Sequence, residues 1–142
     1  MIELTINKKM YEGKFNFKAM FKANQLYSSQ GSSDDGASQL WIAFVTGDDS
    51  AVYKALRVLL PNAKVTDDEI MDFLDEKDAS GEYDQFAKDL ESELQHSGFF
   101  RRAAQHWLDF TDRYKDAATA KMEAGQKKAM NSMLEEMRKS LS

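Results

Sequence analysis

The sequence contains no cysteine among its 142 residues. Disulfides, thiolate zinc sites and cysteine nucleophiles are therefore excluded, and this composition fits a reducing compartment. The longest uninterrupted apolar run covers 40–45, which is far short of the ~20 residues that a membrane-spanning helix needs. The first residues lack a charged segment followed by an apolar one, so we expect neither a signal peptide nor a membrane partner.

Histidine is almost as scarce, with only two in the chain. His106, Asp109 and Asp112 have the i, i+3, i+6 spacing of roughly one helix face and are the best candidates to hold a divalent ion. Because the chain has 24 acidic residues, such spacing is expected by chance, and we predict no metal site. His96 falls at an expected helix end, where an imidazole caps backbone carbonyls.

Catalytic patterns are missing as well. No glycine-rich loop is followed by a lysine for phosphate binding, and no Ser-His-Asp arrangement is recognisable. The neighbouring carboxylates Asp67 and Asp68 are explained by the start of a helix, whose positive end favours them. We therefore predict that the protein is not an enzyme, takes no cofactor, and works through surfaces that bind other proteins.

The net charge of −5 is unevenly distributed along the chain. Residues 1–33 carry five lysines against two glutamates, whereas residues 34–98 carry sixteen acidic side chains against five basic ones. The acidic middle disfavours nucleic acid as a partner, because phosphate binding needs clustered positive charge. Basic ends that flank an acidic centre would let copies associate head to tail, although solvated charge on helix exteriors is the simpler interpretation.

The first residues have the pattern of a β-hairpin. Apolar and polar side chains alternate over 2–7 and again over 11–17, with Lys8 and Lys9 between them, and a period of two indicates paired strands. Everything later has helical spacing or turn residues, with a capping box at 66–69 and a loop at 28–36. Helices are expected at 17–28, at 40–45, at 52–60, from 66 to a turn at 78–81, at 82–97 and at 99–114.

The predicted fold class is α+β and mostly α. An N-terminal β-hairpin should pack on a bundle of about five helices, because an isolated two-stranded ribbon is marginal in water. This globular domain is expected to span 1–114. Residues 116–129 contain almost no bulky side chains, so 115–142 are expected to form a polar spacer and an amphipathic, extended C-terminal helical arm.

Two segments are candidates for partner binding. Phe99 and Phe100 precede Arg101 and Arg102, which puts aromatic rings beside cations, a combination that is enriched at interfaces. Adjacent residues of a helix point about 100° apart, so one of the two rings should point away from the core that buries the other. The alternative is that these rings are simply core.

The second candidate is the apolar face of the C-terminal segment, formed by Met130, Met133, Leu134 and Met137. Methionine-rich faces adapt to varied partners, so this face is predicted to bind a partner. The alternative, equally open from the sequence, is a helix that packs on its own domain or on another copy.

The order of these motifs resembles a known family. The hairpin over 2–17, the helix through Tyr27, the 41–48 junction, the helix start at 66–74 and the segment 94–100 (Leu-Gln-His-Ser-Gly-Phe-Phe) are similar to tail assembly chaperones of long-tailed phages. The similarity is greatest to those of phages and prophages of Gram-positive bacteria, and it covers about 1–114.

The resemblance implies a non-virion, non-catalytic protein that binds the tape measure protein and keeps it soluble in the host cytoplasm during tail assembly. It also implies a homo-oligomer, and a short form of a pair whose longer, frameshifted form recruits tail tube protein. A helical oligomeric adaptor or regulatory domain without a phage role is the alternative.

Overall fold

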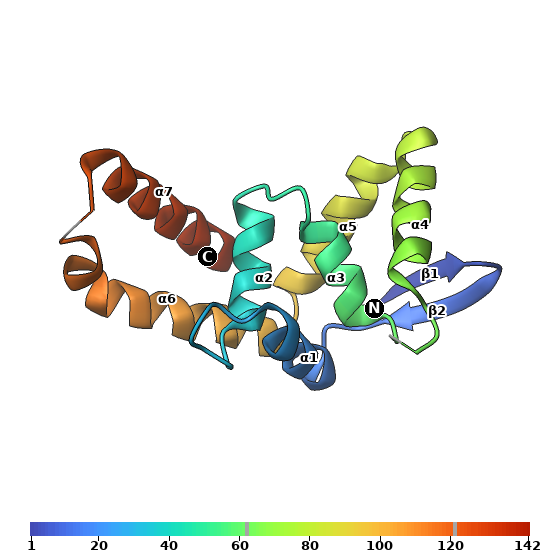
Figure 1. The fold of residues 1–142 in the computed structure, drawn as a ribbon, viewed down its shortest axis with the longest axis horizontal. Helices are drawn as coiled ribbons and strands as arrows, with labels where there is room; N and C mark the ends of the chain where they lie inside the picture. Colours follow the sequence, from blue (N-terminus) through green and yellow to red (C-terminus); the bar gives the residue numbers. More distant parts are fainter. Residues whose placement is uncertain (62, 121) are drawn as a thin grey trace.

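The computed structural model describes residues 1–61, 63–120 and 122–142 (Figure 1). Two antiparallel strands are followed, in the described residues, by seven helices. The strands are β1 (Ile2–Ile6) and β2 (Lys9–Gly13), and the helices are α1 (Phe17–Tyr27), α2 (Gly36–Val45), α3 (Ala51–Leu59), α4 (Asp67–Ala79), α5 (Tyr83–Gln95), α6 (Gly98–Thr119) and α7 (Ala124–Leu141). The predicted fold class, mostly α with an N-terminal hairpin, is confirmed.

The hairpin follows the predicted alternation. Leu4 and Ile6 are buried in the core, whereas Glu3 and Thr5, which alternate with them, are exposed. Asn7 and Lys8 form the turn with positive φ values of 51° and 64°, as expected for a two-residue hairpin turn that matches the twist of the strands. The second strand ends at Gly13, earlier than predicted, because Asn16 accepts a hydrogen bond from the Ala19 amide (3.0 Å) and starts α1.

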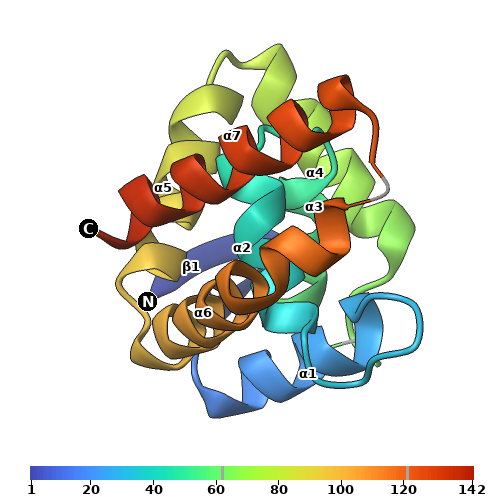
Figure 2. The same ribbon diagram turned by 90° about the vertical axis from the view of Figure 1, so that its left-hand side faces the viewer.

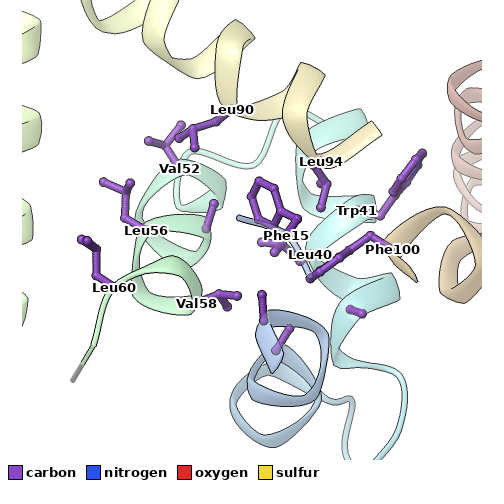
Figure 3. Close-up of a cluster of buried hydrophobic side chains, with 14 of the residues drawn as sticks. Phe15, Leu40, Trp41, Val52, Leu56, Val58, Leu60, Leu90, Leu94 and Phe100 are labelled. Carbon is purple, nitrogen blue, oxygen red and sulfur yellow. The ribbon is translucent and has the colours of Figure 1, made fainter. Parts of the chain in front are cut away.

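The core surrounds α2, which lies between the other helices (Figures 1 and 2). Leu40 and Trp41 on this helix are fully buried and belong to one continuous cluster with side chains of α1, α3, α5, α6 and α7. Figure 3 shows them together with side chains of α3, α5 and α6. The prediction of a helix at 40–45 is therefore correct in type. The helix starts earlier, at Gly36, where a side chain would collide with the Ala23 carbonyl at 2.0 Å.

The connection from α3 to α4 is fixed by side chains on both helices. The predicted capping box is present, with the Glu69 amide donating to Thr66 Oγ1 (3.2 Å) and the Thr66 amide donating to Glu69 Oε1 (3.1 Å). Arg57 of α3 is buried and donates to the Val65 carbonyl (2.8 Å) and to Asp67 (2.9 Å).

The C-terminal segment corrects the expectation of an extended arm. Helix α6 runs through the proposed boundary at 114, and α7 turns back to pack on α2 and α6 (Figure 2). The Trp41 indole donates to Ser140 Oγ (2.7 Å), and Arg138 pairs with Asp112. The apolar stripe of α7 is thus covered by the chain's own helices. This packing removes the stripe from water, which is favourable, and it needs no second protein. One residue of the predicted spacer, Lys121, lies outside the described residues.

Candidate partner-binding groove

The four residues predicted at the start of α6 have different surroundings. Ser97 caps the helix by accepting from the Phe100 amide (3.3 Å) and donates to the Phe15 carbonyl (2.6 Å). Phe100 is fully buried and packs edge-to-face on Phe15 at 5.2 Å between ring centroids. Phe99 keeps 38% of its surface exposed. One ring is therefore core and the other points outward, as the 100° spacing predicts.

The two arginines also separate. Arg101 donates to the Gln95 carbonyl (3.1 Å) and to the Leu141 carbonyl, so it connects the end of α5 to the end of α7. The guanidinium of Arg102 instead lies 5.0 Å from the centre of the Phe99 ring, close enough for a cation–π contact. Arg101 therefore has a structural role, and Arg102 remains beside the exposed ring.

The α7 candidates are mostly turned inward. Leu134 and Met137 are fully buried, and Met130 and Met133 are partly buried against the core. A stripe that the core covers offers a partner little apolar surface in this conformation. The proposed partner-binding role of α7 stays a prediction, and it would require this helix to leave the core.

A groove lies between α1, the loop 28–35 and α6, with a volume of about 830 Å³. Phe99 and Arg102 belong to its lining, and so do Trp107 and Phe110 farther along α6. The other side is formed by Met20 and Asn24 of α1 and by polar loop side chains. The full lining is Met20, Asn24, Ser29, Ser32, Asp34, Asp35, Ser38, Phe99, Arg102, Ala103, His106, Trp107, Phe110 and Thr111.

Exposed aromatic rings mark both ends of this groove. Phe17 of α1 packs edge-to-face on Phe99, with ring centroids 5.5 Å apart, and is itself 57% exposed. Phe110 and Tyr114 are paired at 4.9 Å and are 62% and 52% exposed. Clustered apolar surface of this kind is rare on a protein that has no partner. We call the groove and these four rings the aromatic groove.

The loop side of the aromatic groove is held by hydrogen bonds. Asn24 accepts from the Ala37 amide (2.8 Å), and Asp35 accepts from the Ser29 amide (2.8 Å). Burial by itself would raise the pKa of Asp35, but the hydrogen bonds from Ser29 and Gln39 outweigh it and lower the pKa below the ordinary value. The carboxylate therefore stays ionised and keeps the loop closed over the start of α2.

Sequence reasoning found Phe99 and Arg102 but not the rest of the groove. Helix α6 has two apolar sides: Ala104 and Leu108 are buried with Phe100, whereas Trp107 and Phe110 line the groove. The apolar residues of 99–114 cover more than one face of a helix, and this width indicates a second apolar surface besides the core. The polar Asn24 within the apolar stripe of α1 was a second signal.

The histidines have no catalytic arrangement in the described part of the chain. His96 Nδ1 lies 2.7 Å from the Ser92 carbonyl, at the predicted helix end. His106 lines the groove, but Asp112 pairs with Arg138 and Asp109 accepts from Gln105. Among the residues that the structure describes, no group of three metal-ligating side chains could hold an ion. The site therefore offers shape, aromatic surface and charge.

Comparison with known proteins identifies the family. A family model described as phage tail assembly chaperone protein, TAC, matches residues 3–107, well over half of the chain. The chain belongs to the phage tail assembly chaperone family. A search of curated proteins and a search of solved structures both found no match.

The family match includes the hairpin, α1 to α5 and the first part of α6. For a tail assembly chaperone, contact with tail proteins is the expected activity. Phe110, Tyr114 and all of α7 lie beyond the matched residues. None of the helices in the described ranges is long and apolar enough to cross a membrane.

Proposed function

We propose that this chaperone binds the tape measure protein of a phage tail and keeps it soluble until the tail tube assembles around it. The activity is stoichiometric and non-catalytic, and it takes place in the host cytoplasm, where several copies act on one client. The observation that supports this role is the aromatic groove, which exposes four rings on a chain of the tail assembly chaperone family.

The groove suits an amphipathic helix of the client. From Phe99 to Tyr114 the exposed side of α6 follows helical spacing, and at ~1.5 Å per residue this distance is about four turns of a client helix. Aromatic side chains that fill such a contact typically provide most of its binding free energy. Apolar helices are also the segments of a long client that aggregate when they are left in water.

The test is co-expression of the tape measure protein with the wild-type chain and with a groove variant, Phe99→Ser combined with Phe110→Ser. Wild type should move the client into the soluble fraction and co-purify with it. The groove variant should lose most of this activity. Phe110 is 62% exposed, so its change should affect the thermal melt little, whereas Phe99 loses its contacts with Phe17 and Arg102. The melt of the double variant therefore checks that it is folded at the temperature of the assay.

A control variant removes an exposed apolar side chain elsewhere. Met10 on the hairpin is 68% exposed, so Met10→Ser changes surface apolarity without touching the groove and should behave as wild type. A client that is equally insoluble with and without the wild-type chain contradicts the proposed function. A soluble client with the groove variant assigns binding to another surface.

A further inference from the structure

The outward face of α1 carries positive charge that the rest of the described chain leaves unpaired. Lys18 and Phe21 lie on this face and Lys14 precedes it, and Phe21 is 55% exposed. No acidic residue occurs between Gly13 and Ser33. Among the described residues, Lys14 and Lys18 take part in none of the ion pairs. We call Lys14, Lys18 and Phe21 the basic face.

Helix α4 has an outward face of the opposite charge. Asp68, Met71, Asp72 and Asp75 follow the i, i+3, i+4, i+7 spacing of one helix side, and all four are exposed. Met71 is 49% exposed between these carboxylates. None of the three aspartates joins an ion pair within the described ranges. We call these four residues the acidic face.

The neighbouring acids on α4 have structural roles that Asp72 and Asp75 lack. Asp67 is held by Arg57, and Glu69 closes the capping box with Thr66. Asp68 lies in the first turn of α4, where the positive helix end favours a carboxylate. Asp72 and Asp75 are exposed beyond that turn and join no ion pair in the described chain, so the fold of one copy gives no reason for their place beside an exposed methionine.

The two faces are complementary in charge and in pattern. Each one places an exposed apolar side chain, Phe21 or Met71, among charges of one sign. Helices of 11 and 13 residues are about 16 and 20 Å long, so they match in length as well. Within one copy they lie apart, with α3 between them (Figures 1 and 2), so a chain cannot satisfy both of its own faces.

We infer that the basic face of one copy docks on the acidic face of a second copy. Because the two faces are different surfaces, the contact is heterologous and leaves one free face at each end, which produces open chains of copies. Phe21 and Met71 supply the apolar centre, and the lysines and aspartates supply direction and register. Phe17 of the aromatic groove is next to Lys18 and about one helical turn before Phe21, so the contact borders that groove. The inference does not depend on the proposed function.

The test measures the mass of the full-length protein by sedimentation velocity over a range of concentrations. Wild type should form a series of species that grows with concentration. These species should contain fewer copies at about 1 M salt than at about 0.1 M salt. The reason is that the Debye length falls from ~10 to ~3 Å, which weakens the attraction between the lysines and the aspartates. Two double variants each remove one face. The lysine variant is Lys14→Ala with Lys18→Ala, and the aspartate variant is Asp72→Ala with Asp75→Ala. Each should raise the concentration at which half of the protein is associated about tenfold or more.

Mixing the two variants gives the decisive result. Each variant keeps one intact face, so an equimolar mixture should form a one-to-one heterodimer and nothing longer. The control Lys127→Ala with Lys128→Ala removes two exposed lysines from α7 and should assemble as wild type. Thermal melts of all variants should match, since every altered side chain is exposed.

Three outcomes overturn the inference. The first is a wild-type protein that stays monomeric at every concentration at low salt. The second is assembly by either variant alone to the wild-type extent. The third is a mixture that stays monomeric or that forms closed dimers of one variant, since this would mean that the contact is absent or joins identical surfaces.

Discussion

Arg57 is the most constrained charged side chain of the described fold. The residue is 8% exposed, and its guanidinium donates to Asp67 at 2.9 Å and to the Val65 carbonyl at 2.8 Å, while its Nε atom has no hydrogen-bond partner. A buried cation that lost its carboxylate would be strongly unfavourable. The hydrogen bond from Arg57 in turn holds the pKa of Asp67 below its ordinary value.

This pair predicts a pH dependence of stability. The folded-state pKa of Asp67 is depressed, so its contribution is complete above the unfolded carboxyl pKa of about 4 and is lost as pH falls through the lower folded value. Asp67→Asn removes this contribution, so its unfolding free energy should fall less steeply than that of wild type below about pH 4. Urea unfolding at a series of pH values measures both slopes, and equal slopes would exclude Arg57 as the cause.

Thr66 predicts a second residue-level effect. Its hydroxyl accepts from the Glu69 amide (3.2 Å), which no helical carbonyl can satisfy. Thr66→Ala should therefore lower the unfolding free energy by about 1 kcal/mol, measured by denaturant melts. Thr46→Ala is the control, because Thr46 Oγ1 donates to the Ile42 carbonyl at an exposed helix end and caps no amide. An unchanged midpoint for Thr66→Ala would mean that the cap contributes nothing.

At the level of elements, α7 changes how the molecule holds together. It joins α2 through the Trp41–Ser140 hydrogen bond and joins α6 through the Arg138–Asp112 ion pair. Met137 is fully buried within the same continuous cluster as Trp41. The C-terminal helix and the rest of the described fold therefore share one core and should unfold together.

Shortening the buried side chain of α7 tests this shared core. Met137→Ala should lower the unfolding free energy of the whole protein by about 2–5 kcal/mol, as is typical of buried large-to-small changes. Met130→Ala, at a partly buried position on the same helix, should cost less. Chemical denaturation followed separately by helical signal and by tryptophan fluorescence reports both. Loss of α7 alone, with an unchanged main transition, would show that the helix is an independent arm.

Local sequence patterns were sufficient to predict the helices and strands, but long-range contacts determine which of their faces are buried. The hairpin alternation and the Thr66 box involve residues a few positions apart, so the sequence was sufficient for them. The burial of Leu134 and Met137 depends on α2, far away along the chain. An amphipathic stripe specifies that something covers it but not what does so, and this is why α7 was expected to project.

The same limit applies to the candidate site. The 100° offset between Phe99 and Phe100 predicted that one of the two rings points outward, but not which one. The groove could not be predicted, because it needs α1 and the loop 28–35 beside α6. Arg57 was missed for a similar reason: its burial follows from the meeting of α3 and α4, which no spacing within α3 reveals.

At the scale of the whole molecule, the groove and the two charged faces consist of different residues. The aromatic groove lies between α1 and α6, and the basic face lies beside it on α1. The acidic face is on α4, a helix that lies apart from α1 (Figure 1). If copies join through the two charged faces, each copy presents one groove, and a chain of copies offers a row of grooves to one long client. Binding and assembly then become separable properties.

This separation gives a prediction for the two classes of variant. A tape measure fragment of one amphipathic helix should bind the variant Lys14→Ala with Lys18→Ala as tightly as it binds wild type, because the groove is intact. The full-length client should be less soluble with that variant, since it loses the avidity of linked sites.

The groove variant, Phe99→Ser with Phe110→Ser, should show the opposite behaviour. It should assemble as wild type does in sedimentation but should not bind the fragment. Titration with the fragment, followed by tryptophan fluorescence, measures fragment binding, and sedimentation velocity measures assembly. If the lysine variant also loses the fragment, the basic face is part of the client site and the two properties are one.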